Sequence, residues 1–425
     1  MLFRSPTTSK PRVVIVGGGF AGIELAKNLR DFEAQIVLID KNNYHTFQPL
    51  LYQVATAAME PDSIAYPFRE IFNHQHNFIF RMAEVSKIKP EENAIETSIG
   101  DITYDFLVLA MGSRTNYFGM EDIQKNAMPM KTVPEALALR NLMLENFEKA
   151  LLMNTIEERE ALMNIAVVGG GPTGVETAGS LGELKTHVLP HDYPELDFER
   201  MQIHIIDMED RLLKTMSPQA SDSAEKFLKR FDINIWVNAK VASYDGKLLI
   251  LSNGKKLLTD TVIWAAGVTG EIIPGLKPET IVGNRIKVDP HNRVEGYSNI
   301  FAIGDVAAMI TEKTPKGYPM LAPVAIQQAK LLAKNFKRLE NQKPLEAFVY
   351  HNLGVLATIG RNNAVVELAF VRFYGFVAWF VWLFVHLMAL VGFRNKIVAF
   401  VNWAWNYFSY DRGLRLIIKP FRRTP

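Results

Sequence analysis

The chain has 425 residues, of which 47 are Lys or Arg, 45 are Asp or Glu, and 48% are hydrophobic. This length and composition allow two or three domains with cores and exclude a disordered or collagen-like chain. The complete absence of cysteine excludes disulfides, thiolate metal sites, cysteine-ligated iron–sulfur clusters and dithiol relays. The first eleven residues, MLFRSPTTSKP, contain no long apolar core or cleavage site, so no secretory signal is expected and the protein is placed on the cytoplasmic side.

Charge is distributed unevenly along the chain. Residues 346–425 contain nine Lys and Arg against three Asp and Glu, although the whole chain has a net charge of only +2. The same segment holds four of the six tryptophans, Trp379, Trp382, Trp403 and Trp405. Basic residues beside clustered aromatic residues are typical of a membrane interface. The C-terminal segment is therefore expected to meet a lipid bilayer surface.

Residues 12–40 read RVVIVGGGFAGIELAKNLRDFEAQIVLID, a predicted strand, glycine-rich turn, helix and second strand. Gly17, Gly19 and Gly22 fill the GxGxxG pattern, and Asp40 ends the second strand. The glycines permit a tight turn, a close approach to a pyrophosphate, and close packing of helix on strand. The acid is placed to accept a hydrogen bond from a ribose hydroxyl. A turn that only connects strand and helix is the alternative, but the whole context favours a dinucleotide site.

The same unit occurs a second time, beginning with NIAVVGGGPTGVETAGSLGEL at residue 164. Gly169, Gly171 and Gly174 repeat the glycine pattern, and a later strand ends at Asp207. Two such units predict two bound dinucleotides. An acid at this strand end repels a 2′-phosphate, so NADH is expected rather than NADPH, although Arg211 lies close enough in sequence to leave the preference open.

Two apolar strands ending in small residues return the chain between domains: YDFLVLAMGSRTN, which contains Gly112, and DTVIWAAGVTG. A third, YSNIFAIGDVAA, ends in Gly304 and Asp305 ahead of a helix predicted to begin near Pro323. This order of motifs resembles the flavoproteins with two dinucleotide domains. The resemblance implies that the first site holds FAD, the second holds NADH, and Asp305 contacts the flavin's ribityl chain or pyrophosphate. The alternative for Asp305 is a helix-capping acid.

The predicted fold is α/β, with two Rossmann-like dinucleotide-binding domains, one for FAD and one for NADH, plus a C-terminal helical membrane-anchoring segment. Four segments are expected along the chain: residues 1–160 as the first part of the FAD domain, 161–285 as the NADH domain, 286–345 as the second part of the FAD domain, and 346–425 as the anchor.

Longer stretches resemble one family, the type II NADH:quinone dehydrogenases, which are single-subunit respiratory enzymes that pump no protons. The matching segments include IDKNNYHTFQPLLYQVATA, GGGPTGVETAGSLGEL, APVAIQQAKLLAKNF, LATIGR and the stretch from His386 to Ile417. The lack of cysteine agrees with this family, because dithiol reductases, thiol-based NADH oxidases and sulfide:quinone oxidoreductases all need one or more thiols.

The resemblance implies two catalytic residues. Glu176 matches a glutamate at the nicotinamide side of the flavin, and its alternative is an acid favoured by the helix dipole. Gln327 matches a glutamine that faces the isoalloxazine and the quinone, and its alternative is a solvated helix position. For His45 and Gln48, which lie in a loop expected near the flavin, ligand binding and loop packing stay open.

The chain departs from the family at two positions expected on the quinone side. Pro323 replaces a glutamine at the start of a helix, where a proline is acceptable because its missing N–H would have no helical partner. Leu353 stands where the family commonly has a lysine. The fold is expected to survive both changes, while quinone affinity, quinone type or the proton route differs.

The apolar run from Phe373 to Phe393 contains no Asp, Glu, Lys or Arg, and it is followed by RNKIVAFVNWAWNYFSY. In the second stretch Ile397, Val401, Trp405 and Phe408 form one stripe, which predicts an amphipathic helix lying in the interface plane. Arg412, Arg415, Lys419, Arg422 and Arg423 follow it. The tail is interpreted as a monotopic anchor rather than a span, and a core helix at a dimer contact is the alternative.

The predicted function is an FAD-dependent oxidoreductase that passes a hydride from NADH to FAD and two electrons to a membrane quinone. The expected partners are quinone, the bilayer surface on the cytoplasmic face of the cell membrane and a second copy of the chain; neither nucleic acid nor a metal is expected. Two alternatives stay open: an NADH-dependent reductase of a protein acceptor, and a catalytically silent NAD(H)-binding sensor.

Overall fold

The structure is a computed structural model that describes residues 8–409 and 413–418. The chain forms two compact units. The first unit contains the residues up to Thr46, Tyr66–Arg114 and Val268–Asn352, and the second contains Phe47–Ala65, Thr115–Gly267 and the residues from Leu353 onward. The second unit thus includes residues 47–65 and 115–160 as well as the C-terminal helices. The four functional boundaries expected from the sequence stay a prediction.

The first unit is built on a five-stranded parallel sheet with the order β22-β9-β1-β2-β5. Its strands are β22 (Ile300–Ala302), β9 (Phe106–Leu109), β1 (Arg12–Val16), β2 (Gln35–Asp40) and β5 (Phe78–Met82). In the central strand Val16 pairs with Ile39 on one side and with Leu109 on the other. These runs are apolar on both faces because a parallel sheet is covered on both sides.

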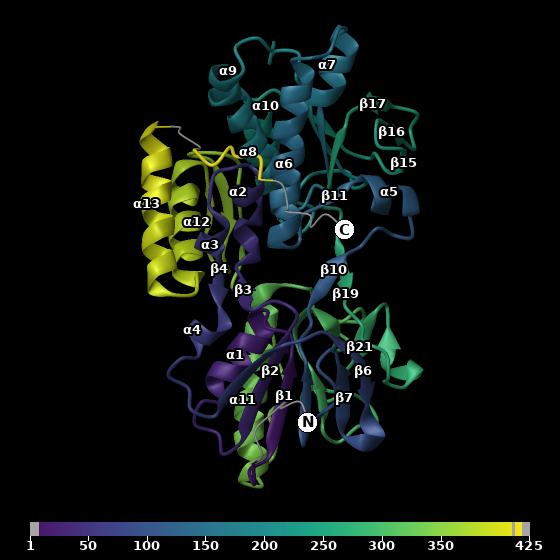
Figure 1. Cartoon of the computed structure of the whole chain (residues 1–425), viewed down its shortest axis with the longest axis vertical. Coiled ribbons are helices and arrows are strands. Elements are labelled where there is room, and N and C mark those ends of the chain that lie inside the picture. The colour runs from purple at the N-terminus through teal and green to yellow at the C-terminus, as the bar shows by residue number, and fades with distance from the viewer. Residues whose placement is uncertain (1–7, 410–412, 419–425) are drawn as a thin grey trace, which may run out of the picture. The chain divides into compact units, whose positions relative to one another are not determined.

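Helices α1 (Phe20–Asn28) and α11 (Ala322–Glu340) pack against each other beside this sheet (Figure 1). As expected, Pro323 lies in the first turn of its helix. The remaining elements of this unit are α4 (Phe68–Ile71), β6 (Val85–Lys89), η2 (Pro90–Glu92), β7 (Ala94–Thr97), β8 (Ile102–Thr103), η3 (Pro278–Thr280), β20 (Ile281–Val282), β21 (Arg285–Lys287), η4 (Gly304–Val306) and β23 (Ala307–Ala308). Four short strands lie at the ends of the three chain segments that form this unit. They are β3 (Tyr44–Thr46), β4 (Ala65–Pro67), β10 (Ser113–Thr115) and β19 (Val268–Gly270).

The second unit repeats the design with the parallel order β11-β18-β12-β13-β14. Its strands are β11 (Met128–Pro129), β18 (Thr261–Trp264), β12 (Ile165–Val168), β13 (Ile203–Ile206) and β14 (Ile233–Trp236). Two antiparallel sheets accompany it: β15 (Val241–Tyr244), β16 (Leu248–Leu251) and β17 (Lys256–Leu258), and then β24 (Val355–Thr358), β25 (Ala364–Glu367) and β26 (Arg372–Tyr374).

Helices surround these sheets in the second unit. They are η1 (Gln48–Leu50), α2 (Leu51–Ala55), α3 (Pro61–Ile64), α5 (Glu121–Asn126), α6 (Val133–Ala150), α7 (Ile156–Met163), α8 (Pro172–His187), α9 (Leu189–Asp192) and α10 (Pro218–Lys229). Helix α8 follows the second glycine turn and packs against β24. The α/β fold with two Rossmann-like sheets is therefore confirmed.

The apolar run from Phe373 to Phe393 does not form one helix. It begins in β26, turns at Gly375, where φ is +78°, and continues as α12 (Phe376–Ala389). At 1.5 Å per residue these 14 residues extend about 21 Å, less than the roughly 30 Å of a bilayer's hydrocarbon core. Among the described residues, none of the helices combines the length and apolarity needed to cross a membrane.

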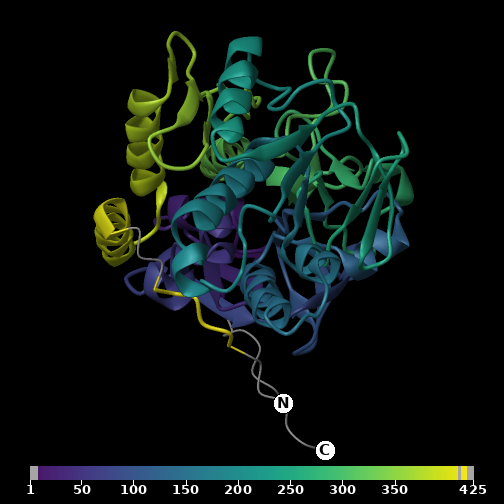
Figure 2. The ribbon, with the colours of Figure 1, turned by 90° about the horizontal axis from the view of Figure 1, so that it is seen from above.

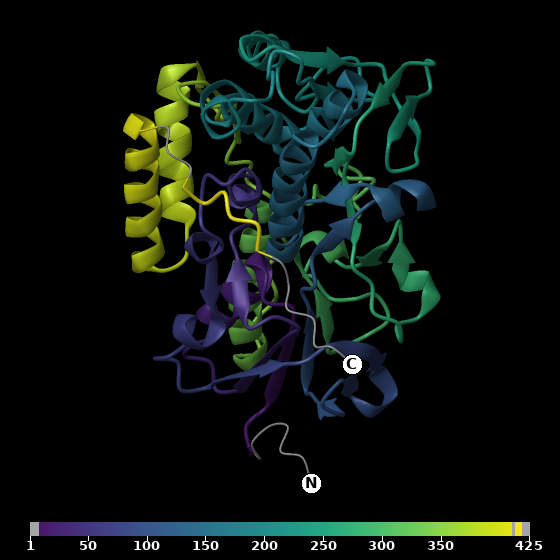
Figure 3. The same ribbon diagram turned by 45° about the horizontal axis from the view of Figure 1, so that its top comes forward.

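The predicted amphipathic helix is present as α13 (Phe393–Ser409), and it lies beside α12 in all three views (Figures 1, 2 and 3). The stripe predicted from the sequence is exposed: Ile397, Val401 and Trp405 are about half to two-thirds exposed, and Phe408 is 84% exposed. Of the basic residues expected after this helix, Arg415 is described, whereas Arg412, Lys419, Arg422 and Arg423 lie outside the described residues.

Candidate active site

The first glycine turn connects β1 to α1 in the first unit. Gly17 has a φ of +102°, and a Cβ there would lie 2.4 Å from the carbonyl oxygen of Ala110. A Cβ on Gly22 would lie 1.9 Å from the carbonyl oxygen of Gly17, so helix and turn meet without side chains between them. By contrast, no atom lies within 4 Å of a Cβ on Gly19. That open space, at the N-terminus of α1, fits the pyrophosphate of a dinucleotide.

Asp40 holds this turn from the end of β2. One carboxylate oxygen accepts a hydrogen bond from the Gly18 N–H at 2.7 Å, and the other accepts from the Asn42 N–H at 2.8 Å. Burial raises the pKa of Asp40, and the two backbone donors act in the opposite direction. Each oxygen keeps a further lone pair, which leaves room for the expected bond from a ribose hydroxyl. That bond stays a prediction.

The Gly304–Asp305 turn is held by three side chains that the sequence did not point to. Ser113 Oγ donates to Asp305 Oδ2 at 2.6 Å, and Gln328 Oε1 accepts from the Gly304 N–H at 2.7 Å. Arg285 Nε donates to the Asp305 carbonyl at 3.0 Å. The alternative reading of Asp305 as an N-cap residue is wrong, because the N-cap position of α11 is Leu321 and that of η4, in which Asp305 lies, is Ile303.

Gln327, the glutamine expected to face the flavin, is only partly buried. Its Nε2 donates to the carbonyl of His351 at 2.9 Å, and its Oε1 accepts from the His351 N–H at 2.9 Å. The neighbouring Gln328 is the buried one. Two glutamines in a row on a helix point about 100° apart, so sequence alone could indicate the pair but not which member faces inward. Gly112, expected near the cofactor, has a φ of +76° and no atom within 4 Å of a Cβ.

The second glycine turn, between β12 and α8, repeats the first closely. Gly169 has a φ of +119°, and its Cβ would lie 2.4 Å from the Ala265 carbonyl oxygen. A Cβ on Gly174 would lie 1.8 Å from the Gly169 carbonyl oxygen, and a Cβ on Gly171 would have no neighbour within 4 Å. Asp207 accepts from the N–H groups of Gly170 and Glu209, as Asp40 does in the first turn.

Arg211, which left the choice between NADH and NADPH open, is bound to its own loop. Its Nη2 donates to the carbonyls of Lys214 at 3.2 Å and Met216 at 3.1 Å. The other terminal nitrogen of Arg211, Nη1, is buried without a hydrogen-bond partner among the described residues. Asp207 repels a 2′-phosphate, and the preference for NADH over NADPH stays a prediction.

Glu176 is a buried carboxyl on α8, two residues after the last glycine of the second turn. Its Oε1 accepts from Trp382 Nε1 at 3.1 Å and from the Thr358 N–H at 3.4 Å. Burial raises the pKa of Glu176 to about 8, with the two donors acting in the opposite direction. The group is therefore mostly protonated at neutral pH. Trp382, which is 1% exposed and stacks on His386 with ring centroids 4.1 Å apart, was not singled out from the sequence as a partner of Glu176.

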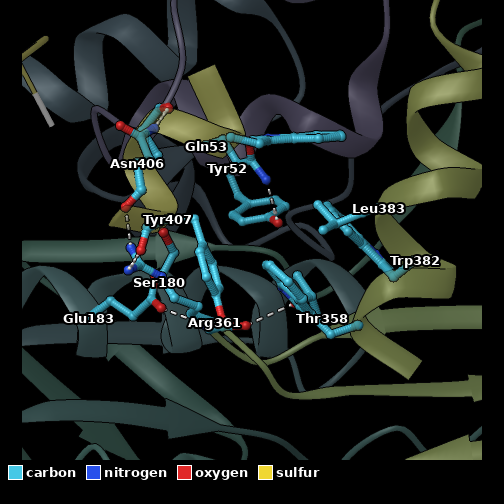
Figure 4. Close-up of a pocket in the computed structure, with 14 residues that line it drawn as sticks. Tyr52, Gln53, Ser180, Glu183, Thr358, Arg361, Trp382, Leu383, Asn406 and Tyr407 are labelled. Carbon is cyan, nitrogen blue, oxygen red and sulfur yellow. Dashed lines mark hydrogen bonds between the residues drawn. The ribbon is translucent and has the colours of Figure 1, made fainter. Parts of the chain in front are cut away.

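A cavity that is partly open to solvent lies in the second unit beside Trp382 (Figure 4). Helices α12 and α13 supply aromatic lining, and α2, α8 and the loop after β24 supply polar groups. The lining residues are Tyr52, Gln53, Ala58, Ser180, Glu183, Thr358, Gly360, Arg361, Trp379, Trp382, Leu383, Trp403, Asn406 and Tyr407. Such a mixture of aromatic walls with a few polar groups is typical of small-molecule sites.

Polar bonds fix α13 over this cavity. Trp403 Nε1 donates to Gln53 Oε1 at 2.9 Å, and Asn406 Nδ2 donates to the Ala58 carbonyl at 3.0 Å. Arg361 donates to the carbonyls of Asn406 and Tyr407 at 2.7 and 2.8 Å, where the end of the helix leaves such groups without helical partners. The polar face of α13 is therefore turned to the protein and its apolar stripe outward.

Known proteins resemble this chain over almost its whole length. Residues 11–329 match the family described as pyridine nucleotide-disulphide oxidoreductase, and residues 352–409 match the NDH2 C-terminal domain. The chain is 33% identical to the type II NADH:quinone oxidoreductase Ndh of Mycobacterium tuberculosis, over 99% of this chain and 94% of the relative. The chain belongs to the type II NADH:quinone oxidoreductase family.

Two solved structures share the fold of this type II NADH:quinone oxidoreductase. NDH2 from Plasmodium falciparum in complex with NADH has a TM-score of 0.88 and 24% identity, with 96% of this chain and 100% of that chain covered. The sulfide:quinone oxidoreductase of Aquifex aeolicus has a TM-score of 0.73 and 21% identity, with 94% and 95% covered. The family predicted from the sequence is confirmed.

Proposed function

We propose that this chain binds FAD at the first glycine turn and NADH at the second, and that it passes a hydride from NADH to FAD and two electrons on to a membrane quinone. The overall activity follows from the family: the chain is an FAD-dependent NADH:quinone oxidoreductase that does not pump protons. The observation that carries two dinucleotide sites is the repeated turn, in which Gly19 and Gly171 each leave open space at a helix N-terminus. The order, with FAD at the first turn and NADH at the second, is the one that the family resemblance implies.

When bound, FAD supplies the hydride acceptor and the two-electron donor. The protein's task is to position the reactants and to manage protons. Glu176 is suited to holding a proton, because its raised pKa keeps the carboxyl neutral at pH 7. Since Oε1 accepts two N–H groups, we place the proton on Oε2.

Gln327 is proposed as a hydrogen-bonding residue for the quinone. The amide nitrogen and the amide oxygen of Gln327 each form one hydrogen bond to the backbone of His351. The amide nitrogen has a second hydrogen and the amide oxygen a second lone pair. The bonds to His351 thus fix the amide's orientation while leaving it able to donate to a quinone carbonyl.

Membrane docking is proposed for the outer faces of α12 and α13, on the cytoplasmic face of the cell membrane. Large apolar side chains recur along both helices and are exposed: Phe376, Val377, Phe380, Phe384, Val385 and Met388 on α12, and Phe393, Ile397, Phe400, Val401, Trp405 and Phe408 on α13. A contiguous apolar surface of this kind is unusual on a soluble monomer and fits an interfacial helix pair.

The cavity beneath these two helices is proposed as the route by which quinone leaves the bilayer. Trp379 and Leu383 come from α12, and Trp403 and Tyr407 from α13, so the same helices that carry the apolar stripe also line the cavity (Figure 4). An aromatic lining suits a planar ring with an apolar tail.

A homodimer is proposed, with residues 413–418 at the contact. Arg415 forms an ion pair with Asp192, and the backbone of Ile418 exchanges hydrogen bonds with the Asn141 side chain at 2.7 and 3.3 Å. Leu416 and Ile418 are nevertheless more than half exposed. A second copy of the chain that covers residues 413–418 would explain why these apolar side chains are exposed although their backbone is held in place. Light scattering in detergent should give the dimer mass for the wild type and the monomer mass for Leu416→Glu with Ile418→Glu.

The activity is tested first. Purified protein should be yellow, should lose its colour with NADH under anaerobic conditions, and should regain it when quinone is added. A protein that bleaches and is not reoxidised by quinone would contradict the quinone assignment.

Docking and quinone entry are tested separately. Phe384→Glu with Phe400→Glu should abolish flotation with anionic liposomes, whereas Leu152→Glu, at an exposed apolar position of the same unit outside the stripe, should not.

Leu383→Trp should raise the KM for quinone and leave ferricyanide reduction unchanged. The control is Val385→Trp, two residues along α12 and outside the cavity lining. Equal KM values for the two tryptophan variants would exclude the cavity as the route.

A further inference from the structure

The loop of residues 208–216 holds the second glycine turn. It follows Asp207, the acid after β13, and leads into α10. Asp207 accepts a hydrogen bond from the Gly170 N–H, and the Leu213 N–H donates to the Gly170 carbonyl at 2.7 Å. Both polar backbone groups of Gly170 are therefore held by Asp207 and this loop. Because Gly170 directly precedes Gly171, the loop fixes the backbone beside the open space of the second turn.

The backbone of this loop is strained at Leu213. Its φ is +49°, in the left-handed region that bulky residues rarely adopt, and its side chain is buried. Such a conformation persists only where the surrounding contacts enforce it. One of these contacts comes from α10, where Ser221 Oγ donates to the Leu212 carbonyl at 2.5 Å. The conformation of the loop therefore depends on how α10 is held.

Glu367, the last residue of β25, holds the N-terminus of α10. Ser217, the N-cap residue of α10, donates its N–H to Glu367 Oε2 at 3.0 Å and its hydroxyl to Oε1. The Tyr374 hydroxyl also donates to Oε1, at 3.3 Å. Partial burial raises the pKa of Glu367, but these donors and the charge of Arg372 together lower it below its ordinary value. The carboxylate is therefore ionised at neutral pH and accepts hydrogen bonds on both oxygens.

The second turn has one backbone donor fewer than the first at the start of its helix. The first residue of α1 is Phe20, whereas the first residue of α8 is Pro172, which has no N–H. The N–H groups at the start of a helix are the groups that bind a pyrophosphate. With one of them missing, binding at the second turn depends more strongly on the placement of the remaining backbone, which the loop fixes at Gly170.

We infer that Glu367 is a positioning residue for NADH, because its bonds to Ser217 fix the loop that holds the second glycine turn. This inference rests on the proposed placement of NADH at that turn. Glu367 lies in the part of the chain that matches the NDH2 C-terminal domain, whereas the turn and Ser217 lie in the part that matches the pyridine nucleotide-disulphide oxidoreductase family. The C-terminal segment thus supports the NADH site in addition to carrying the helices proposed for membrane docking.

Two variants loosen opposite ends of α10. In Glu367→Gln, one carboxylate oxygen becomes an amide nitrogen, which cannot accept a hydrogen bond from Ser217. The control is Arg230→Gln at the C-cap of α10, where Arg230 Nη1 donates to Asn363 Oδ1 at 3.3 Å. Each variant removes a contact between α10 and the C-terminal segment, but only Glu367→Gln acts at the end of α10 that joins the loop.

Two small molecules separate binding at the turn from hydride transfer. ADP-ribose carries the adenosine and pyrophosphate of NADH and cannot transfer a hydride, so its inhibition constant against NADH reports binding at the turn. Reduced nicotinamide riboside donates a hydride but has no pyrophosphate or adenosine. In Glu367→Gln we expect the KM for NADH and the inhibition constant of ADP-ribose to rise roughly 3- to 30-fold. The kcat/KM with reduced nicotinamide riboside should change less than about twofold.

The full-length holoenzymes are compared, with folding checked by circular dichroism and FAD content. Arg230→Gln should change each quantity less than about twofold. Ser217→Ala keeps its N–H bond to Glu367 and loses only the hydroxyl donor, so it should show the same pattern with a smaller rise.

An unchanged inhibition constant for ADP-ribose in Glu367→Gln, or an equal rise in Arg230→Gln, would overturn the inference. Equal losses with NADH and with reduced nicotinamide riboside would also overturn it, because they would indicate a general structural role. A wild-type protein that is not inhibited by ADP-ribose would instead overturn the proposed placement of NADH at the second turn.

Discussion

The two glycine turns have nearly the same backbone and different surroundings. In each, the first glycine has a positive φ, the second leaves open space, and the third lies against the first. Gly17 donates to Ile39 and Gly169 to Ile206, both at 2.8 Å. The turns differ in what satisfies the middle carbonyl: the His45 side chain in the first, and the Leu213 backbone in the second. The same turn is thus completed in two different ways by residues from outside the motif.

The acid in the helix after each turn also has different surroundings in the two units. Glu24 and Glu176 occupy the same place, two residues after the third glycine. Glu24 is partly exposed and lies 3.6 Å from Lys330, where an ion pair contributes little. Glu176 is buried against Trp382, and its pKa is raised to about 8. Identical motif positions therefore carry one surface acid and one buried acid.

Filling the open space in each turn should abolish binding of the dinucleotide at that turn. Gly19→Val and Gly171→Val place side chains where the protein has no atom within 4 Å, and both glycines have negative φ. Both variants should therefore fold. The first should lose at least roughly 100-fold in FAD affinity and purify colourless, since contacts to a charged group are lost. The second should stay yellow and show a raised KM for NADH. If both lose FAD, the assignment of one dinucleotide to each turn is wrong.

Glu176→Gln should reduce kcat with NADH and quinone by roughly 100-fold, the lower range for loss of a proton-transferring group. The reason is that an amide does not release the proton that we place on Glu176. Glu24→Gln is the matched control at the same position of the other turn and should change kcat less than twofold. Steady-state assays of both variants test this, and similar rates for the two would remove Glu176 from the mechanism.

The pH dependence of the free energy of unfolding tests whether the Glu176 carboxyl is buried. Glu176 has a folded pKa of about 8 against an ordinary value of 4.5, so the folded state keeps the proton that the unfolded state releases between these values. The free energy of unfolding therefore falls as pH rises through this window. Relative to the wild type, Glu176→Gln should gain about 3 kcal/mol between pH 5 and 8. Denaturant unfolding across this range measures the gain, and a pH-independent difference would mean that the carboxyl is not buried.

The smallest effect concerns Trp382. Trp382→Phe removes the N–H that stabilises the Glu176 carboxylate, so the pKa of Glu176 should rise further and the alkaline limb of the pH–rate profile should move to higher pH. The change in kcat at neutral pH should be only a few-fold. Trp403→Phe is the control, because Trp403 donates to Gln53 instead. A profile that moves equally in both variants would indicate a general change of packing.

Much of the fold was predictable because its signals are local. The apolar strands, the GxGxxG spacing and the acids at the ends of the second strands depend on residues close together in the chain, and both parallel sheets formed as expected. The stripe on α13 was predictable for the same reason, because exposed positions recur at the helical period. The 21-residue apolar run was ambiguous, since length and hydropathy do not reveal the turn at Gly375.

Patterns of residue types at short spacing were enough to predict the family, the two dinucleotide turns and the amphipathic C-terminal helix. Three further features depend on the folded chain: which of Gln327 and Gln328 is buried, the contact of Trp382 with Glu176 across 206 positions, and the His45 ring nitrogen that has no partner among the described residues. They could not be predicted because burial, pKa and hydrogen-bond satisfaction depend on residues brought together from distant parts of the chain. The same motif therefore produces a surface acid at Glu24 and a buried, mostly protonated acid at Glu176.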